Sequence, residues 1–477
     1  MSGKFPEHKQ LDLSQINKDI LAEWNSENTF QKSIDTRAGH PKFIFFEGPP
    51  SANGMPGIHH VMARSIKDII CRYKTLQGFL VDRKAGWDTH GLPVELGVEK
   101  QLGITKEDIG KKISVDDYNR ACRSEVMKYT AQWRDLTARM GYWVNMDDPY
   151  ITYDNRYIET LWYLLKTIYN KGLLYKGYTI QPYSPAAGTG LSTHELNQPG
   201  CYRDVKDTTC TAQFKVTDAD NKLVKDILAK ADADHKQLYI LAWTTTPWTL
   251  PSNTALCVGP KIDYVAVETK NPYTEQPCTV VVAKSRFSAY FNDKNPGNII
   301  AEMKGTDLLG IRYEQLFPWV DPCELSDSKQ IINKKADAFR VIPGDYVTTE
   351  DGTGIVHIAP TFGADDAKVA KAAGIPSLFM INKAGETRPM VDLTGKYYKT
   401  NELDEAFVRD FINIDIYKEY EGRWVKNAYD PQFTVNGKYD EQAAQKAENL
   451  DIFICMKMKA DGTVFKIEKH VHNYPHC

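Results

Sequence analysis

Two adjacent histidines, His59 and His60, follow a turn rich in glycine and proline and stand at the start of a helical pattern. The turn contains Gly48, Asn53 and Gly54. An imidazole N–H placed there could donate a hydrogen bond to a phosphate as negative charge builds up in a transition state. Because a glycine-rich turn between a strand and a helix is common to many nucleotide folds, these residues predict a site that suits ATP.

The elements around this turn must position the two histidines. The short apolar run 43–46 predicts a buried strand before the turn. After the turn, one helical face collects the apolar residues Met62, Ile66, Ile69, Ile70 and Tyr73. Both histidines then lie at the N-terminus of this helix, where free backbone N–H groups and the positive end of the dipole favour a phosphate.

A second segment, residues 86–95, reads GWDTHGLPVE and follows a short apolar stretch. It places Asp88 and His90 on a turn. A carboxylate in this position could hold an ammonium group by a charge-assisted hydrogen bond.

Together, GPPSANGMPGIHH (48–60) and GWDTHGLPVE resemble the isoleucyl-tRNA synthetases, a family of class I aminoacyl-tRNA synthetases, and the resemblance extends over nearly the whole chain. It implies an α/β fold in which a class I Rossmann-type catalytic domain is interrupted by a β-rich editing domain. It also implies that the carboxylate of isoleucine attacks the α-phosphate of ATP, bound with Mg²⁺, and that the acyl group passes to tRNA(Ile). By the same resemblance, isoleucine is held by Gly48, Pro49 and Asp88, and ATP is faced by Asn53, Gly54 and His60.

The chain departs from the family's HxGH motif, which falls on residues 57–60. Gly57 stands in place of the first histidine, and His59 stands in place of the glycine. Only His60 matches directly, and we expect it to donate to the ATP phosphates. We expect His59 to supply the missing imidazole from a neighbouring position; the alternative is that His59 is only a solvated residue at the helix end.

The composition is ordinary for a soluble globular protein, with 42% hydrophobic and 25% charged residues among 477. This length allows two or three domains with their own cores. The formal net charge of −3 gives no global basic signature, so a tRNA partner must be met by local patches.

The nine cysteines are scattered without a CxxC pair, which favours reduced thiols over a disulfide framework. The N-terminus is polar and shows no secretory signal, and no apolar run approaches the length of a membrane span. We therefore expect a cytoplasmic protein that makes no contact with a membrane, and we expect a monomer.

Helical patterns dominate the chain before residue 203. Residues 11–33 predict a packed N-terminal extension. Ser114 and Asp117 form a capping pair before a pattern that continues to Met140, and Asp154 precedes a similar pattern. We expect the aromatic stripes of these last two segments to pack in the core rather than to bind a ligand.

The pattern changes near residue 205 to short strands with turns between them, TCTAQFKV, QLYILAWTTT, YVAVET and CTVVVA. By the resemblance, this β-rich insertion is the editing domain. The expected division of the chain is a helical extension (1–42), the N-terminal half of the catalytic domain (43–202), the editing domain (203–400) and a connective segment that returns to the catalytic domain (401–477).

Two motifs in the insertion carry hydroxyl, imidazole and carboxylate groups. LAWTTTPWTLPSN (241–253) offers three hydroxyls beside a proline–tryptophan corner, suited to positioning a water and an ester. A TTT run alone is more often one face of a strand, but here it occurs with GDYVTTEDGTGIVHIAPTFGADD (344–366). The resemblance implies that Asp366 holds the α-amino group of a mischarged aminoacyl group, in a pocket shaped by Thr244, Thr245, Thr246, Trp248 and His357.

Such a site answers a limit on recognition for which this family is itself the standard example. A hydrophobic pocket gains only about 1 to 3 kcal/mol from one methylene, so isoleucine and valine are not separated well enough in one step. A second, smaller pocket that admits valine and excludes isoleucine would supply the rest.

Two patterns look like metal sites, and neither predicts a bound metal. YSPAAGT (183–189) stands where many relatives have CPxCGT, but Ser184 and Ala187 cannot replace thiolates. The C-terminal cluster matches the family's HxYPHC strand, so we expect packing or disorder of the chain end rather than ligation by His470, His472, His476 and Cys477. We predict no zinc in this chain.

The family continues past HxYPHC with the rest of the Rossmann domain, a KMSKS loop and an anticodon-binding domain, so we expect this chain to be an N-terminal fragment. The segment KMK (457–459) only superficially resembles KMSKS, because it precedes the returning strand. Two alternatives to the ligase stay open. The chain could act alone as an aminoacyl-tRNA deacylase, or it could be an inactive tRNA-binding module.

Overall fold

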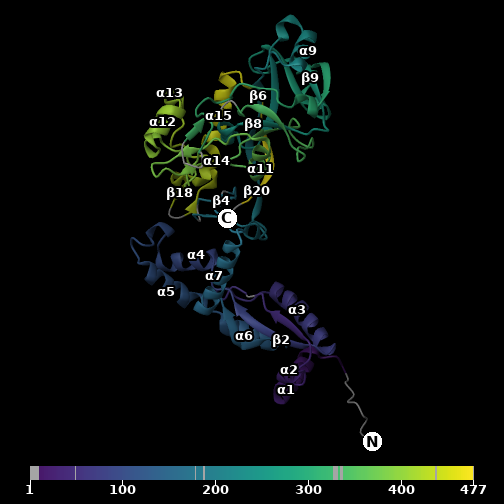
Figure 1. Ribbon diagram of the computed structural model, residues 1–477, viewed down its shortest axis with the longest axis vertical. Coiled ribbons are helices and arrows are strands. Elements are labelled where there is room, and N and C mark those ends of the chain that lie inside the picture. Colours follow the sequence, from purple (N-terminus) through teal and green to yellow (C-terminus); the bar gives the residue numbers. More distant parts are fainter. Residues whose placement is uncertain are drawn as a thin grey trace. The chain divides into compact units, whose positions relative to one another are not determined.

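A computed structural model describes residues 10–475 except 49, 178, 186–187, 326–330, 334–336 and 436–437. The chain divides into two compact units, Met1–Gly177 and Tyr178–Cys477 (Figure 1). Each unit has its own sheet. No helix among the described residues is long and apolar enough to cross a membrane.

The first unit is built on a three-stranded parallel sheet with the order β1 (Lys42–Phe46), β2 (Leu80–Trp87), β3 (Asn145–Ile151). Helix α3 (Ile58–Leu76) connects β1 to β2, so the strand and the helix after the turn are confirmed. The prediction that the strand is buried is wrong, because β1 is an edge strand with one face uncovered: Ile44 is 65% and Phe46 58% exposed. The carboxyl ends of parallel strands meet at one edge of a sheet. The loop after β1 and the turn after β2 therefore lie next to each other.

The remaining helices of this unit confirm the predicted caps. Ser114 accepts a hydrogen bond from the N–H of Asp117 at 3.1 Å, and Asp154 accepts from the N–H of Arg156 at 2.9 Å. The pattern up to Met140 forms two helices rather than one, because the chain between them turns and Tyr129 donates its N–H to the carbonyl of Ala52 at 3.3 Å.

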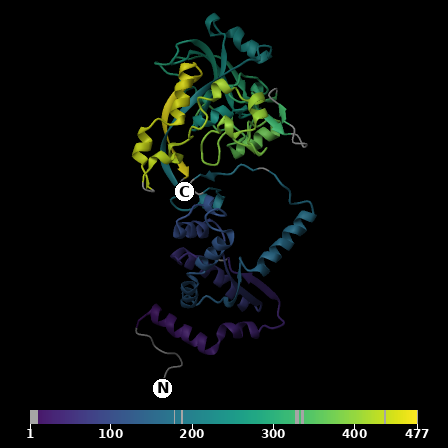
Figure 2. The same cartoon turned by 90° about the vertical axis from the view of Figure 1, so that its left-hand side faces the viewer.

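Figure 2 shows α1 and α2 in purple, one after the other. The helices are α1 (Leu13–Glu27), α2 (Thr29–Asp35), α4 (Leu92–Leu102), α5 (Val115–Val126), α6 (Thr130–Arg139) and α7 (Asn155–Asn170).

Two apolar helix faces of this unit are exposed. Met62, on the apolar face of α3, is 67% exposed, and the helix buries Arg64, Cys71 and Thr75 instead. Helix α7 has no buried residue, so the prediction that its aromatic stripe packs in the core is wrong. The stripe of α5 and α6 does pack, with Trp133 fully buried. An apolar stripe shows which face of a helix can be covered, but it does not say what covers it.

The second unit is built on a nine-stranded mixed sheet. Its strands β6, β7, β9 and β10 are the four segments predicted from the sequence. Val281 belongs to the larger core cluster on one face, whereas Val280 and Val282 belong to a cluster on the other. Both faces are therefore buried, which explains the continuous apolar runs. The order is β11 (Asn298–Lys304), β9 (Asp263–Lys270), β10 (Pro277–Ala283), β7 (Leu238–Thr244), β15 (Ile355–Ile358), β8 (Ala255–Val258), β14 (Arg340–Pro343), with β6 (Tyr202–Lys215) between β7 and β20 (Val464–Pro475).

Residues after 401 belong to the same compact unit as this sheet. Phe407 and Ile454 lie in its larger core cluster. Strand β20 pairs with β6 in antiparallel fashion from Val464 to Pro475, and Figure 2 shows α15 (Leu450–Ala460) beside β20 in yellow. The four-part division of the chain stays a prediction.

Short elements complete the second unit. Helix α9 (Lys222–Lys230) lies near β9 and β11 at one end of the sheet (Figure 1). The other helices are α8 (Thr193–Leu196), α10 (Phe287–Tyr290), α11 (Ala364–Ala373), α12 (Glu405–Phe411), α13 (Ile414–Tyr417) and α14 (Glu441–Lys446). Paired two- and three-residue strands are β4 (Tyr183–Ser184) with β5 (Thr189–Gly190), β12 (Cys323–Leu325) with β13 (Ile331–Asn333), β16 (Met380–Ile381) with β17 (Thr387–Arg388) and β18 (Thr434–Val435) with β19 (Lys438–Tyr439).

Candidate functional site

The loop between β1 and α3 is fastened to the end of β2. Ala52 donates its N–H to the carbonyl of Asp88 at 3.1 Å, and Asp88 donates its N–H to the carbonyl of Pro50 at 3.1 Å. The indole N–H of Trp133 donates to the carbonyl of Gly54 at 2.8 Å. The GPPSANG and GWDTHG motifs therefore lie together and form one candidate site.

His60 lies in the first turn of α3. Its Nδ1 accepts the N–H of Gly57 at 2.9 Å, so the proton of the neutral ring lies on Nε2, which can donate to a ligand. Burial lowers the pKa of His60 from its usual value, and the charge of His59 lowers it further. The ring is therefore neutral at neutral pH.

His59 is exposed and lies against His60, with 3.8 Å between the ring centroids. A Cβ added at Gly57 would lie 2.8 Å from Cε1 of His59, which is too close for carbon atoms without a shift of the ring. The imidazole of His59 thus fills the space that a side chain at position 57 would enter. Both interpretations of His59, a replacement for the missing imidazole and a solvated residue at the helix end, stay predictions.

Asp88 is half-buried at the end of β2, and its Oδ1 accepts the N–H of His90 at 3.2 Å. The ring of His90 is engaged elsewhere, since its Nδ1 lies 2.8 Å from the hydroxyl of Thr152. Gly48 lies next to Lys67, whose Nζ would be 3.5 Å from a Cβ at that position. Pro49 lies outside the described residues.

Two cations near His60 were not predicted from the sequence. Lys67 forms an ion pair with the buried Glu47 at 2.6 Å, and Arg64 is buried with its guanidinium over the ring of Trp133. Both positive charges contribute to the lowered pKa of His60, so they raise the electrostatic potential at the start of α3. Their spacing from His60, four and seven positions along one helix face, was the signal in the sequence.

A second site lies where β7 and β15 end. These strands are parallel neighbours, with Val356 opposite Trp243, so the segments that follow them emerge at the same edge of the sheet. The turn η3 (Pro247–Ser252) follows β7. The ring of Trp248 packs against Phe362 of the loop after β15, with 4.9 Å between centroids.

A series of hydroxyl groups connects the end of β7 to His357. The hydroxyl of Thr246 lies 3.4 Å from those of Thr244 and Thr249, and the hydroxyl of Thr249 lies 3.2 Å from Nε2 of His357. Thr245 is half-buried and makes no side-chain hydrogen bond within the described part of the chain. Thr249, which sequence reasoning missed, is the link between the two motifs.

His357 is only 8% exposed. Burial lowers its pKa to about 4, so the ring is neutral at neutral pH. Its Nδ1 is buried without a hydrogen-bond partner among the described residues, and so are the hydroxyl of Thr361 and the indole N–H of Trp248. Buried polar atoms are normally satisfied, so each of these three atoms needs a water or a ligand as its partner.

Asp366 lies in the first turn of α11, on the segment that follows β15. Its Oδ2 accepts the N–H of Ala359 at 2.9 Å, yet burial raises its pKa to about 6. A Cβ added at Gly363 would lie 2.7 Å from the carboxyl carbon of Asp366. Glycine at 363 therefore allows the carboxyl group to fold back over the loop.

Comparison with known proteins identifies the family. The class I tRNA synthetases (I, L, M and V) match residues 19–430. The chain belongs to this family. The fold expected for it, an α/β class I domain with a β-rich insertion, is thereby confirmed.

Relatives of this class I synthetase chain include three proteins named isoleucine–tRNA ligase. That of Bacteroides thetaiotaomicron is 67% identical over 493 residues, which cover 100% of this chain and 42% of the relative. That of Porphyromonas gingivalis is 59% identical, covering 100% and 41%, and that of Cytophaga hutchinsonii is 52% identical, covering 98% and 40%. The resemblance to isoleucyl-tRNA synthetases is confirmed, and the chain spans about two fifths of the length of these relatives.

Among solved structures, the editing domain of the P. knowlesi cytosolic leucyl-tRNA synthetase is similar at 11% identity with a TM-score of 0.31. The match covers 57% of this chain and 98% of that domain. A likeness this weak adds nothing to the assignment.

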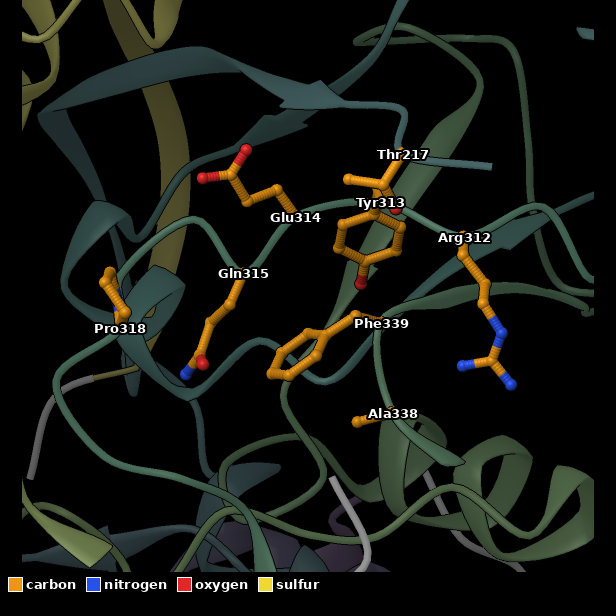
Figure 3. A pocket seen from close by; sticks show the side chains of 8 residues that line it. All are labelled: Thr217, Arg312, Tyr313, Glu314, Gln315, Pro318, Ala338 and Phe339. Carbon is orange, nitrogen blue, oxygen red and sulfur yellow. The ribbon is translucent and has the colours of Figure 1, made fainter. Parts of the chain in front are cut away.

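An open hollow of about 380 Å³ elsewhere in the second unit of the synthetase chain shares no residue with either site. Figure 3 shows Arg312 and Glu314 pointing to opposite sides of Tyr313. The hydroxyl of Tyr313 donates to the side chain of Asn253 at 2.7 Å. The lining residues include no cysteine, histidine or lysine, so we assign no chemistry to this hollow.

One group within the described ranges has spacing that could suit a metal ion, Asp232, His235 and Glu268, with their ligand atoms within 4.8 Å of one another. Glu268 already accepts hydrogen bonds from the N–H of Asp232 at 2.6 Å and from Asn298 at 3.0 Å. Asp232 is exposed. These contacts explain the group without an ion.

The C-terminal residues that resemble metal ligands have other neighbours in the synthetase chain. His472 lies 3.1 Å from Asp207, and the ring of His470 lies edge-on to Trp243 at 5.4 Å, so both pack on the sheet. His476, Cys477 and Ala187 lie outside the described residues, and the absence of zinc stays a prediction. The KMK segment lies within α15 with Met458 buried, so it is not an exposed loop.

Proposed function

We propose that this chain is part of an isoleucine–tRNA ligase, with one site for the activation of isoleucine and a second for the hydrolysis of mischarged valyl-tRNA(Ile). The observations that carry the proposal are the contact between Thr249 and His357 and the Asp366 carboxyl group bonded to the N–H of Ala359, two residues after His357, in a chain 67% identical to an isoleucine–tRNA ligase. The eight cysteines among the described residues are free thiols, in keeping with a cytoplasmic protein, and we propose that it acts as a monomer.

At the first site, the Asp88 carboxylate would hold the ammonium group of isoleucine, next to Gly48 and Pro49. ATP with Mg²⁺ would lie along Asn53, Gly54 and the start of α3. The neutral His60 would donate from Nε2 to a phosphate oxygen as the carboxylate of isoleucine attacks the α-phosphate and pyrophosphate leaves. His59 would provide a second donor from beside Gly57.

At the second site, Asp366 would pair with the ammonium group of the aminoacyl ester. An ammonium in contact lowers the pKa of the carboxyl group, so the substrate itself would keep Asp366 ionised. The hydroxyl of Thr249, which is oriented by the neutral His357, and the hydroxyl of Thr246 would hold a water near the ester carbonyl. Water adds to the carbonyl carbon, the ester C–O bond breaks, and valine and the free 3′ hydroxyl of tRNA result. Thr244, Thr245 and Trp248 would shape a pocket too small for isoleucine.

The proposal is tested by incubating the purified chain with valyl-tRNA(Ile) and, separately, with isoleucyl-tRNA(Ile). We expect hydrolysis of the valyl ester at least about tenfold faster than that of the isoleucyl ester, because one methylene is worth about 1 to 3 kcal/mol in a closed pocket. Equal rates for the two esters, or no hydrolysis of either, would contradict the deacylation site.

A second candidate, the stand-alone deacylase, is favoured by one observation: every group placed in the deacylation site lies in a single compact unit. ATP–pyrophosphate exchange dependent on isoleucine separates the candidates. Exchange together with deacylation supports the ligase, deacylation without exchange supports the deacylase, and tRNA binding without either activity supports a binding module.

A further inference from the structure

The main chain of Trp248 is held on both sides by residues far along the chain. Its N–H donates to Oδ1 of Asp451 at 2.9 Å, and its carbonyl accepts the hydroxyl of Tyr397 at 2.5 Å. Trp248 follows Pro247 in the first turn of η3, where an N–H has no partner within the turn. The carboxylate of Asp451 thus caps the turn that leads from Thr246 to Thr249.

Both groups that hold Trp248 are themselves immobilised. Asp451 and Tyr397 are fully buried, and Asp451 lies in the first turn of α15, which packs on η3. The second oxygen of Asp451 accepts from Nζ of Lys426 at 2.9 Å, and Lys426 also pairs with Asp207 at 3.1 Å. A buried carboxylate needs such a partner to stay ionised.

The cation in this network stays charged. Burial alone would lower the pKa of Lys426, but the negative charges of Asp451 and Asp207 outweigh burial and raise it. Asp207 is also 3.1 Å from His472 on β20. The network therefore ties β6, α15 and β20 to the turn beside the deacylation site.

We propose that Asp451 and Tyr397 are positioning residues for the deacylation site: they hold the peptide groups on either side of Trp248, so that Thr246 and Thr249 keep their places beside His357. This inference rests on the proposed deacylation. Neither residue touches the substrate. They act through the turn, because the 3.2 Å contact between Thr249 and His357 is lost if the turn moves by about 1 Å, and displacements of that size reduce rates strongly.

Tyr397→Phe is the cleanest test, because it removes one hydroxyl and keeps the buried ring. Tyr417→Phe is the matched control: Tyr417 is equally buried and donates its hydroxyl to a backbone carbonyl, that of Tyr398, at 2.7 Å, but it does not touch the turn. With the full chain and valyl-tRNA(Ile), we expect Tyr397→Phe to lower kcat about three- to tenfold, the effect of one hydrogen bond, with KM within about twofold. Tyr417→Phe should leave both constants within about twofold of wild type.

Hydrogen exchange of residues 244–252, measured by mass spectrometry, gives a readout that does not depend on activity. Exchange of this segment should be faster in Tyr397→Phe than in wild type and unchanged in Tyr417→Phe. Asp451→Ala should show the same acceleration and a larger loss of kcat. Asp451→Asn keeps an oxygen for the N–H of Trp248, so it should show slower exchange and a higher kcat than Asp451→Ala.

Equal kcat and equal exchange in the two tyrosine variants would overturn the positioning role, whatever the aspartate variants do. Absence of valyl-tRNA(Ile) hydrolysis by the wild type would overturn the proposed function instead. In that case faster exchange in Tyr397→Phe would still show that Tyr397 holds the turn at Trp248. Unchanged exchange would refute this role of Tyr397 too.

Discussion

The two histidines at the centres of the two sites sit in opposite environments. His357 is on a strand inside the nine-stranded sheet, nearly inaccessible to solvent, with one ring nitrogen next to Thr249 and the other without a partner in the described structure. His60 is half-buried at the start of a helix, with Nδ1 occupied by the N–H of Gly57. Its neighbour His59 is exposed.

The difference extends to the elements that carry them. The sheet around His357 is covered on both faces by core clusters, which include Ile355 on one face and Ile358 on the other, and its positioning contacts come from the same unit. Helix α3, which carries His60, exposes its apolar face. A site enclosed by its own unit holds its groups in place before a substrate binds, whereas an open site depends on its ligand to complete the geometry.

The largest expected effect, and the sharpest test of this contrast, is the loss of stability when the pH is lowered. An unfolded histidine binds a proton below about pH 6.5, whereas folded His357 does so only near its pKa of about 4. The stability contributed by neutral His357 is therefore present above pH 6.5 and is lost as the pH falls toward 4, by about 3 kcal/mol in full. The fall in melting temperature between pH 7.5 and pH 5 should be clearly smaller in His357→Gln than in wild type, and thermal unfolding at the two pH values measures it.

His60→Gln serves as the comparison variant in the same experiment. The pKa of His60 is also lowered, but its ring is less buried. His60→Gln should therefore reduce the fall in melting temperature between pH 7.5 and pH 5 by less than His357→Gln does. An equal fall in melting temperature in wild type and His357→Gln would show that the buried ring of His357 does not cause the loss of stability in acid.

Removal of the carboxyl group in the enclosed site should have the next largest effect. Asp366→Ala should lower the rate of valyl-tRNA(Ile) hydrolysis about ten- to a hundredfold, since a charged hydrogen bond is worth about 1.5 to 3 kcal/mol. Asp365→Ala, a change at the exposed neighbouring acid, should stay within about twofold of wild type. Both variants need a check of folding by circular dichroism, and a folded Asp366→Ala with the wild-type rate would remove Asp366 from its proposed role.

The pH profile of hydrolysis tests the same carboxyl group without a mutation. Burial raises the pKa of Asp366 to about 6, so the free chain loses the carboxylate as the pH falls through 6. The kcat/KM for valyl-tRNA(Ile) should therefore be about tenfold lower at pH 5 than at pH 7.5. A flat profile over this range would mean that Asp366 is either ionised throughout or not used.

The open site should show the smallest effects. His60→Ala should weaken the binding of ATP with Mg²⁺ about three- to tenfold, as expected for one hydrogen bond, and His59→Ala should weaken it by about twofold because its ring is exposed. Equilibrium dialysis can measure both, with His40→Ala as the control for an exposed histidine of the same unit. If His59→Ala behaves like the control, His59 is a solvated residue and does not replace the imidazole absent at Gly57.

Features that depend on neighbours in the sequence were predicted correctly. The caps at Ser114 and Asp154 involve residues two or three positions apart, and the start of α3 next to His59 and His60 follows from the change of pattern after the glycine-rich turn. The buried strands β9 and β10 were recognised from their apolar runs. The sheet's strand order was not predicted, because pairing depends on contacts between segments far apart.

The exposed stripe of α7 was the clearest error about packing. Its pattern indicates an amphipathic helix correctly, but the same pattern describes a helix in a core and a helix with an open apolar face. At the second site, Thr249 was within the recognised motif and was overlooked, because only the parallel pairing of β7 and β15 brings its hydroxyl to His357.

By itself, the sequence determined the residue types that could bind ATP, an ammonium group and an ester, the local elements that carry them and the family to which the motifs point. Only the tertiary structure decided which of these groups meet, that His357 is neutral, and that Asp451 and Tyr397 hold the turn at Trp248. The physical reason is the separation along the chain between the residues that interact. Caps and helix patterns arise between residues a few positions apart, whereas burial, pKa shifts and hydrogen bonds across the sheet depend on atoms that the folded chain brings together from distant positions.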